Sequence, residues 1–385
     1  MTAQSEFPIK IYPPHPRQEG KTTLDSLPQD AIIKSCDYIE MASCFSPEGI
    51  RCCVHGTHGG PLIAKKEDLQ NNSISHAAIV SRRTEILEII NDLRKGEELP
   101  CTSCSNLQEK KLSNIDLSYL GGKKLPAGMN IQHYTSCNQR CTYCIFTVED
   151  FWVKSQYDPI EYFEIFKKIG KLRGGNWIDF SGGETSLLKD FDRILEYLIN
   201  NDLGPVVIYT NATFFKQSIF DALKNNIPDP QKDNRIILTT SLDTGLPSTY
   251  RKIRGSRDYE KVIANLIRYK QSGSKNIWLK YVITKDNQTD DDLWSFIFMM
   301  GMLKPERVMI CPDFPYGEPE VPLEMVQFAA KLWCLIEDVV GSRVIDYTMD
   351  FGAPIWVKYH ADLPTAREEA RKKLSSIGFP GMQKQ

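Results

Sequence analysis

The octapeptide "CNQRCTYC", residues 137–144, places three cysteines in the spacing CxxxCxxC: Cys137, Cys141 and Cys144. It follows the run "NIQHYT" at 130–135, whose β-prone residues predict a strand. In a reducing compartment, clustered thiols bind metal or do chemistry more often than they form disulfides. The loop therefore indicates a functional site directly after a strand.

From about residue 128 onward, short β-rich runs alternate with amphipathic stretches. The predicted strands are 130–135, 177–181, 205–210, 236–242, 277–284 and 307–312. Between them, apolar residues recur at helical spacing, for instance at 159–172, 187–201 and 258–272. Six β-then-α units predict an α/β fold with a partial (β/α)6 parallel barrel, because each crossover helix packs back on the sheet. A closed eight-stranded barrel would need two more units.

The region before the barrel differs in character. Residues 31–63 predict a small β-hairpin around "SPEG", and residues 75–98 predict one long helix with Ser75 as its N-cap. We expect a small cysteine-rich α+β domain here. The expected organisation is a flexible segment 1–30, the cysteine-rich domain 31–110, a linker 111–127, the barrel 128–315 and a C-terminal helical extension 316–385.

Composition excludes several classes of function. The chain has 385 residues, 41% of them hydrophobic, which is enough for one large core and a smaller module. Its 47 basic and 49 acidic residues give a net charge of -2, so we expect neither nucleic acid nor a membrane as partner. The apolar run at 293–303 is too short to span a bilayer and predicts a buried helix. The polar, proline-rich start does not resemble a secretory leader, so we expect a cytoplasmic protein.

The spacing of the loop cysteines bears on the kind of metal. A structural zinc site is usually built from two well-separated pairs of ligands, and a catalytic zinc site favours histidine or carboxylate. Iron–sulfur clusters prefer thiolates packed in one loop, and a four-iron cluster with three protein ligands keeps one iron open. The spacing alone favours an iron–sulfur cluster, and the surrounding motifs decide between a cluster and a zinc site.

With those motifs, the chain resembles the radical S-adenosylmethionine (radical SAM) enzymes, whose signature is CxxxCxxC with an aromatic residue before the last cysteine, as Tyr143 is here. The resemblance implies a 4Fe-4S cluster on the three cysteines, with S-adenosylmethionine chelated by the open iron. One electron, from a donor such as flavodoxin or ferredoxin, then gives a deoxyadenosyl radical that abstracts hydrogen from the substrate. In such an enzyme the protein supplies placement and the cofactor the hard chemistry.

The resemblance covers residues 128–312 and implies cofactor contacts at strand ends, where the loops of a parallel barrel converge. "SGGET" would bring glycine carbonyls and a carboxylate to the ammonium of the cofactor, and "SLD" would bind its ribose. "YRKIRG" would offer an arginine to the methionyl carboxylate, and "LKYVIT" would offer backbone to the adenine, around Val282 and Ile283. The implied cofactor-binding residues are Tyr143, Gly182, Gly183, Glu184, Thr210, Asn211, Ser241, Asp243, Arg254 and Val282.

Each of these motifs is bland by itself, because "GGE" is also an ordinary turn and helix start. Their occurrence together, in order and at strand ends, favours the functional interpretation. The sequence departs from the family in two details. The loop begins "TSCNQRC", and "GGET" lacks the proline that often follows the glutamate. Neither detail removes a ligand.

The N-terminal cysteines resemble a SPASM module, in which a hairpin "G..CC" and a later CxxC hold a second four-iron cluster. In that family the module follows the barrel, whereas here it precedes it. The resemblance implies closure by four thiolates. A four-thiolate zinc site remains an alternative, and the histidines of "HGTHGG", His55 and His58, would join such a site or be solvated. The expected ligands are Cys36, Cys53, Cys101 and Cys104, with Cys44 or Cys52 as substitutes.

Other residues have two interpretations. Cys311 ends the sixth strand, where it would donate hydrogen to a substrate radical, as thiols do in some radical epimerases, or simply pack in the core. His133 is a core residue or a residue behind the site, and Cys334 in an apolar helix is expected to be inert. The mouth of the barrel would be lined by Asp313, Tyr316 and Glu318.

The expected function is that of a radical SAM oxidoreductase or transferase acting on a peptide or protein side chain, because SPASM-like modules resemble those of peptide-maturing enzymes. An alternative is the oxidation or epimerisation of a small polar molecule such as a sugar or nucleoside. An alternative of another class is a non-enzymatic iron–sulfur or zinc protein.

Overall fold

The computed structural model describes residues 23–376 apart from 54–59, 97–98, 100, 103, 105, 122–127, 174–176, 226–235, 314–319 and 347–353. Four residues of the sequence analysis lie outside the described part: His55, His58, Tyr316 and Glu318. Within the described part, no helix is both long enough and apolar enough to cross a bilayer.

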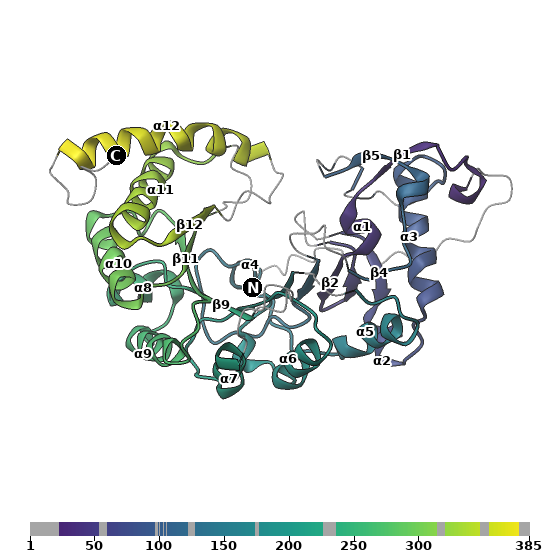
Figure 1. Ribbon diagram of the computed structural model, residues 1–385, viewed down its shortest axis with the longest axis horizontal. Coiled ribbons are helices and arrows are strands. Elements are labelled where there is room, and N and C mark those ends of the chain that lie inside the picture. Colours follow the sequence, from purple (N-terminus) through teal and green to yellow (C-terminus); the bar gives the residue numbers. More distant parts are fainter. Residues whose placement is uncertain are drawn as a thin grey trace, which may run out of the picture.

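A ten-stranded sheet forms the body of the molecule, in the order β12-β11-β10-β9-β8-β7-β6-β2-β3-β4 (Figure 1). All six predicted strands are present and pair in parallel: β6 Met129–Ile131, β7 Ile178–Phe180, β8 Val206–Tyr209, β9 Ile236–Ser241, β10 Ile277–Ile283 and β11 Arg307–Pro312. This confirms a partial parallel barrel. The parallel run is longer than the six strands predicted, because β12 (Arg343–Asp346) adds to β11 and β2 (Ser43–Ser46) adds to β6.

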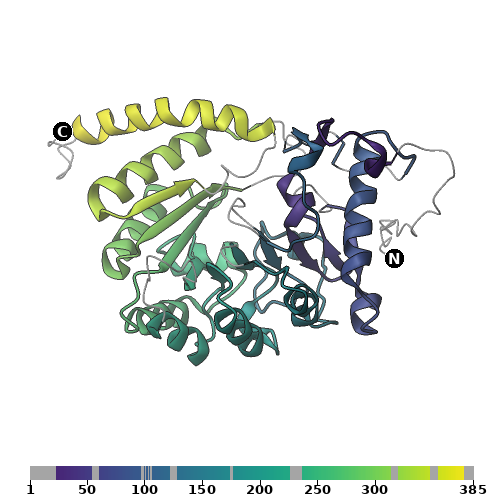
Figure 2. The ribbon, with the colours of Figure 1, turned by 45° about the vertical axis from the view of Figure 1, so that its right-hand side comes forward.

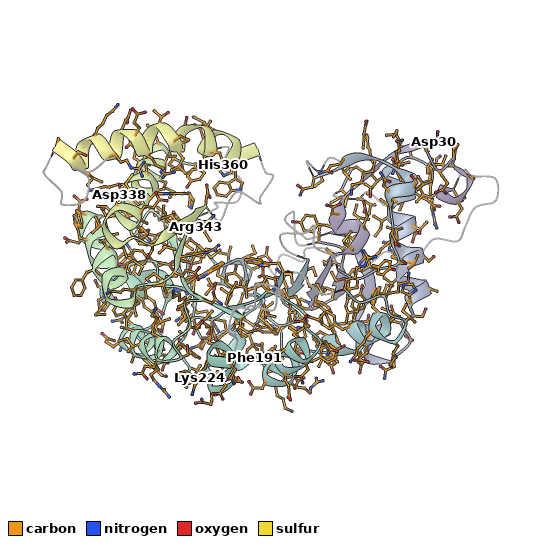
Figure 3. The ribbon with its side chains drawn as sticks, in the orientation of Figure 1. Asp30, Phe191, Lys224, Asp338, Arg343 and His360 are labelled. Carbon is orange, nitrogen blue, oxygen red and sulfur yellow. The ribbon has the colours of Figure 1, made fainter. Side chains whose placement is uncertain are left out.

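Helices cover the convex face of the sheet (Figure 1). They are α5 Pro159–Lys168, α6 Phe191–Asn200, α7 Gln217–Asn225, α8 Pro247–Arg254, α9 Tyr259–Lys270 and α10 Asp290–Leu303. The short helix α4 (Ile145–Val148) directly follows the cysteine loop instead. The short 3-10 helix η3 (Thr185–Leu187) precedes α6. Each long helix turns its apolar side to the sheet: Phe191 of α6 packs on Phe180 of β7, whereas Lys224 of α7 points to solvent (Figure 3). The predicted buried helix at 293–303 is α10.

Strand residues alternate between the convex face and the opposite, concave face. On the convex face, Leu279 and Tyr281 pack against α10 and its neighbours. The concave face carries a separate apolar cluster formed by Val207, Ile237, Trp278 and Met309. This alternation fixes which side chains look into the barrel.

The N-terminal region continues the same sheet. The predicted hairpin is present as β2 and β3 (Gly49–Arg51), and β4 (Leu62–Lys65) completes the antiparallel edge. The predicted long helix is α3 (His76–Ile90), and Ser75 caps it by accepting from the N–H of Ala78. Smaller elements accompany them: η1 Leu24–Ser26, β1 Ile32–Ser35, α1 Asp37–Met41, α2 Lys66–Gln70, β5 Gln108–Lys111, which pairs with β1, and η2 Leu112–Asn114.

The C-terminal region contains a strand as well as the expected helices. In Figure 2, α11 (Leu323–Leu335) and α12 (Pro354–Ser376) lie against each other beside β11 and β12. A short π-helical turn, η4 (Ile336–Val340), ends α11. Residues 316–385 are therefore more than a helical extension, because β12 extends the sheet.

Candidate active site

The cysteine loop is attached on one side to the "GGE" turn after β7. The N–H of Gly183 donates to the carbonyl of Tyr134 at 3.0 Å, and the N–H of Glu184 donates to that of Ser136 at 2.9 Å. A Cβ on Gly182 would lie 2.2 Å from the Tyr134 oxygen, and one on Gly183 would lie 2.1 Å from the Ser136 oxygen. The glycines are therefore explained by close approach to the backbone that enters the loop. This reason differs from the expected contact with the ammonium of the cofactor.

The other side of the loop is attached to the end of α8. Arg140 N–H donates to the carbonyl of Arg254 at 3.1 Å, and Thr142 N–H donates to that of Ile253 at 2.8 Å. The buried side chain of Gln139 donates to the Tyr250 hydroxyl at 2.8 Å. The cysteine loop is thus held between two independent elements. Sequence reasoning missed Gln139, although its place inside the cysteine motif was an available signal.

The three thiols of the loop lie close enough to influence one another electrostatically. Burial raises the pKa of Cys141 to about 12, although the charge of Arg254 opposes this; burial also raises the pKa of Cys137. Among the described residues, no three His, Cys, Asp or Glu side chains are placed to share a single ion. Three thiols in one loop fit the three protein ligands of a four-iron cluster, in which each thiolate binds its own iron.

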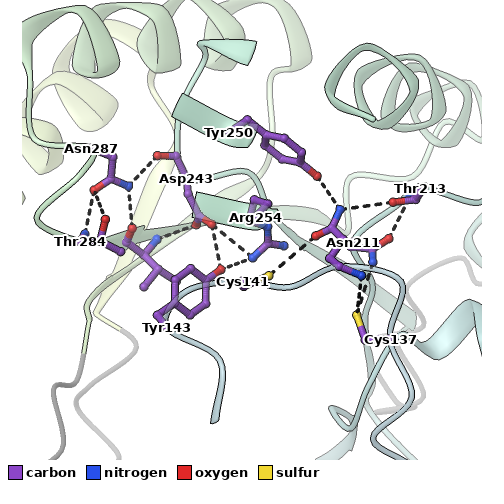
Figure 4. Close-up of polar contacts among 12 residues, drawn as sticks. Cys137, Cys141, Tyr143, Asn211, Thr213, Asp243, Tyr250, Arg254, Thr284 and Asn287 are labelled. Carbon is purple, nitrogen blue, oxygen red and sulfur yellow. Dashed lines mark hydrogen bonds and ion pairs between the residues drawn. The ribbon is translucent and has the colours of Figure 1, made fainter. Parts of the chain in front are cut away.

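A buried polar network surrounds Asp243 at the end of β9 (Figure 4). Its carboxylate accepts from the Val282 N–H at 2.8 Å and from the Tyr143 hydroxyl at 2.8 Å. Arg254 lies 3.3 Å from the same carboxylate and also donates to the Tyr143 hydroxyl. Burial raises the pKa of Asp243, and the charge of Arg254 opposes the shift. The structure therefore brings these four predicted residues together, with the carboxylate already bonded within the chain.

Asn287 completes the network and was missed by sequence reasoning. Its side-chain amide donates to the carbonyls of Asp243 and Val282, both at 2.8 Å, and its oxygen accepts from the Thr284 N–H. Both backbone groups of Val282 are thus bonded within the chain. An adenine contact at this position would use the second lone pair of the Val282 carbonyl. The only available signal was an asparagine shortly after a strand, which is also common in exposed turns.

Glu184 links the ends of β7 and β8. Its carboxylate accepts from the Thr210 hydroxyl at 2.5 Å and from the Asn211 N–H at 2.7 Å. The Asn211 side chain donates to Asn138 at 2.8 Å and lies 3.9 Å from the Cys137 sulfur (Figure 4). Glu184, Thr210 and Asn211 therefore lie together beside the cysteine loop, as predicted. Ser241 is half-buried at the end of β9.

Cys311 is buried on the concave face, where it is in register with Val282 of β10. Burial raises the pKa of the Cys311 thiol to about 11, so it keeps its proton at neutral pH. Cys334 is buried in α11 beside the backbone of Arg367, in keeping with an inert thiol. His133 is buried, with no hydrogen-bond partner for either ring nitrogen among the described residues, and burial lowers its pKa to about 4.

Five N-terminal cysteines form a second group. Cys52 is fully buried and lies beside Cys53 and Cys101, and Cys36 is influenced by Cys53 and Cys104. A Cβ on Gly60 would lie 2.7 Å from the sulfurs of both Cys52 and Cys53. All five thiols are free. The four expected ligands are thus neighbours, and Cys52 joins them more closely than the sequence indicated.

Cys44, the other expected substitute, faces the barrel but is also influenced by the charge of Cys53. It faces the concave side of β2 and accepts from the Gln132 side chain at 3.0 Å. Burial raises the pKa of Cys44 to about 12. Cys44 therefore lies between the barrel face and the group of five, and its place as a substitute ligand stays a prediction.

Comparison with known proteins gives the following similarities. Residues 131–300 match the model of the Radical SAM superfamily. A GTP 3',8-cyclase of Clostridium botulinum (strain Okra / Type B1) is 32% identical over 188 residues, 47% of this chain and 54% of that protein. A probable GTP 3',8-cyclase of Methanocaldococcus jannaschii is 30% identical over 138 residues, 35% of this chain and 42% of that protein.

The chain thus spans about half the length of the curated relatives it matches. Among solved structures, Streptococcus suis SuiB bound to S-adenosylmethionine is 17% identical, with a TM-score of 0.44. The overlap covers 56% of this chain and 49% of the SuiB chain.

Proposed function

The chain belongs to the radical SAM superfamily through residues 131–300, and from this premise we propose an enzyme that removes a hydrogen atom from a carbon of a small polar substrate. The observation that carries this proposal is the loop of three neighbouring thiols, held between the "GGE" turn and the end of α8. Two independent attachments fix the loop, and rigid placement is the protein's part in cofactor chemistry.

Cys137, Cys141 and Cys144 would hold the 4Fe-4S cluster. When bound, the cluster and S-adenosylmethionine supply a deoxyadenosyl radical, with one electron from a donor such as flavodoxin or ferredoxin. The residues of the chain fit a bound methionyl carboxylate, because the Arg254 Nε is buried without a partner among the described residues. Arg254 would donate that N–H to the carboxylate, a charge-assisted hydrogen bond.

Asp243 would orient its neighbours in addition to the expected contact with the ribose. Its carboxylate accepts from Tyr143 and from the Val282 N–H, so it orients Tyr143 and Arg254 and fixes the fifth strand. Ser241, at the end of the same strand, would supply a hydroxyl to the ribose. Glu184, bonded to Thr210 and Asn211, would form the side of the cofactor site next to Cys137.

The relatives favour a small molecule over a peptide as the substrate. Those named above are described as GTP 3',8-cyclases, one of them as probable, so a nucleotide is our first choice. A peptide or protein side chain is the second choice, and the group of five N-terminal cysteines supports it. We propose that these cysteines hold a second metal group, a four-iron cluster or a zinc ion, with Cys36, Cys53, Cys101 and Cys104 as ligands and Cys52 as the substitute.

Cys311 would return a hydrogen atom if the reaction is an epimerisation. The S–H bond breaks, the substrate carbon gains the hydrogen, and the sulfur radical then takes one electron from the same donor and one proton from water. The raised pKa of Cys311 keeps the hydrogen on sulfur, as this step requires.

The proposed function is tested by measuring deoxyadenosine. Reconstituted, reduced protein is incubated with S-adenosylmethionine alone, with GTP, or with a peptide library. We expect GTP to raise the yield and, when deuterated on the reacting carbon, to pass deuterium into deoxyadenosine. A response to peptides alone would favour the second choice. The control is a variant in which all three loop cysteines are alanine. If it forms as much deoxyadenosine as wild type, the proposed activity is excluded and the non-enzymatic alternative is favoured.

A further inference from the structure

The outer face of α10 is apolar and exposed to solvent. The sequence predicted a buried helix at 293–303, and the inner side of α10 is buried, with Leu293 in the core. The outer side carries Trp294, Phe298 and Met302 at successive helical turns. Phe298 is 70% exposed, Met302 is 51% exposed and Trp294 is half-buried. The described part of the chain therefore covers only one side of this apolar helix.

The elements beside α10 extend this face. Single exposed apolar side chains are ordinary, whereas several on one face indicate a surface that another molecule covers. Both α9 and η4 contact α10, and each has an exposed apolar residue, Ile267 and Val339. In Figure 1, α10 lies at the left-hand edge of the molecule, on the convex side of the sheet. A partner bound there would leave the concave face of the barrel open.

The two ends of the outer face carry opposite charges. Asp291 is exposed in the first turn of α10, two turns before Phe298 and on the same side. Lys304 is the exposed C-cap residue at the other end. Within the described residues, the Asp291 carboxylate and the Lys304 ammonium form no ion pair, whereas Asp290 is paired with Lys331 at 2.6 Å. The apolar stripe thus runs from an unpaired anion to an unpaired cation.

A second copy of the chain complements this pattern. A two-fold axis that passes beside Phe298, perpendicular to α10, sets the helices of two copies antiparallel. Phe298 then meets Phe298 of the partner subunit, and Trp294 meets Met302 of the partner subunit, since each lies one turn from the axis. Asp291 lies near Lys304 of the partner subunit, and symmetry makes this ion pair twice. A parallel arrangement would instead bring like charges together.

We propose that the chain forms a two-fold symmetric dimer through the outer face of α10, with the two helices antiparallel. The partner is a second copy rather than a different protein, because the apolar stripe and the charges at its ends are complementary to themselves. Neither the cluster nor the substrate takes part in this contact. The inference therefore stands independently of the proposed function.

The test is sedimentation velocity of the reconstituted protein over a range of concentrations. We expect wild type to be a dimer that dissociates on dilution. Phe298→Glu should weaken the dimer at least about a hundredfold, because it removes two aromatic contacts and places two carboxylates at the axis. Ile32→Glu is the matched control. Ile32 of β1 is 56% exposed and lies in the N-terminal region, on the other side of the molecule from α10 (Figure 1), so this variant should dimerise like wild type.

Exchange of the terminal charges tests the antiparallel arrangement. Asp291→Lys creates two like-charge pairs in the dimer and should weaken it about tenfold. Adding Lys304→Asp restores both pairs with reversed sign, so the double variant should regain most of the affinity. Both substitutions oppose the helix dipole, so damage to the fold would accumulate in the double variant rather than disappear.

Circular dichroism of each variant checks folding, and Met302→Glu replaces Phe298→Glu if that variant does not fold. The proposal is overturned if wild type is monomeric at every concentration, which would leave the face to a different partner. It is also overturned if Phe298→Glu associates as tightly as wild type. The same holds if Asp291→Lys loses no affinity, or if Lys304→Asp does not restore what Asp291→Lys has lost.

Discussion

Replacing Gly183 by alanine should loosen the cysteine loop and its metal. The new Cβ would lie 2.1 Å from the Ser136 oxygen and 2.5 Å from the Thr135 carbonyl carbon, both of them backbone atoms. Real Cβ contacts are essentially never shorter than 3.0 Å, so the backbone of the turn or of the loop must move by most of an ångström. Such overpacking costs about 1–3 kcal/mol.

The same movement strains the two hydrogen bonds that join the turn to the loop, from Gly183 to Tyr134 and from Glu184 to Ser136. Each is worth about 1 kcal/mol. We therefore expect Gly183→Ala to lower the free energy of unfolding by about 3 kcal/mol. Iron retained per chain after reconstitution should fall as well, because the displaced segment leads directly into Cys137.

The assay is urea unfolding followed by circular dichroism, together with iron analysis. Gly301 of α10 provides the control, since a Cβ there meets nothing within 4 Å. Gly301→Ala should leave iron unchanged and stabilise the helix by up to about 1 kcal/mol, because alanine is the better helix former. Wild-type stability and iron content in Gly183→Ala would refute the reasoning.

Three further changes have defined outcomes. Burial lowers the pKa of His133 to about 4, so between pH 6.5 and pH 4 His133 is protonated in the unfolded chain but neutral in the folded chain. The contribution of His133 to the free energy of unfolding is therefore fully present above pH 6.5 and falls by about 2 kcal/mol toward pH 5. The free energy of unfolding of His133→Phe, measured in urea, should fall less between pH 7 and pH 5 than that of wild type. An equal fall in the two proteins would contradict this. Tyr143→Phe removes a donor to buried Asp243 and should cost about 1–3 kcal/mol and weaken S-adenosylmethionine binding in equilibrium dialysis; an unchanged variant would exclude the network. Cys52→Ala should lower the metal content of the reconstituted protein, whereas Cys334→Ala should not. Equal metal contents in the two variants would show that Cys52 is not part of the second site.

Local patterns in the sequence predicted the barrel well. Each of the six strands and the helices between them has its own periodicity, and the Ser75 cap marks the start of α3. β12 was not predicted, because "RVID" is only four residues long and lies in a region whose pattern otherwise predicts helix. β2 was recognised as a hairpin arm, but its parallel pairing with β6 joins residues more than eighty positions apart. No local pattern carries that information.

In the candidate active site, too, local features were predictable from the sequence and long-range contacts were not. The position of each motif was readable, because strand ends of a parallel barrel gather on one rim. The partners of each side chain were not readable: nothing in the sequence indicated that the Asp243 carboxylate accepts hydrogen bonds from Tyr143 and Val282. Asn287 and Gln139 were missed because their roles depend on neighbours that only the fold supplies.

The central claim is that the loop thiols hold a four-iron cluster with one iron open to S-adenosylmethionine. It is tested most directly by electron paramagnetic resonance of the reduced, reconstituted protein, in a Cys101→Ala, Cys104→Ala background that weakens the second site. We predict a cluster signal whose g values shift when S-adenosylmethionine is added, and which disappears when Cys137, Cys141 and Cys144 are also replaced. A signal that survives that replacement, or that does not respond to S-adenosylmethionine, would contradict the account.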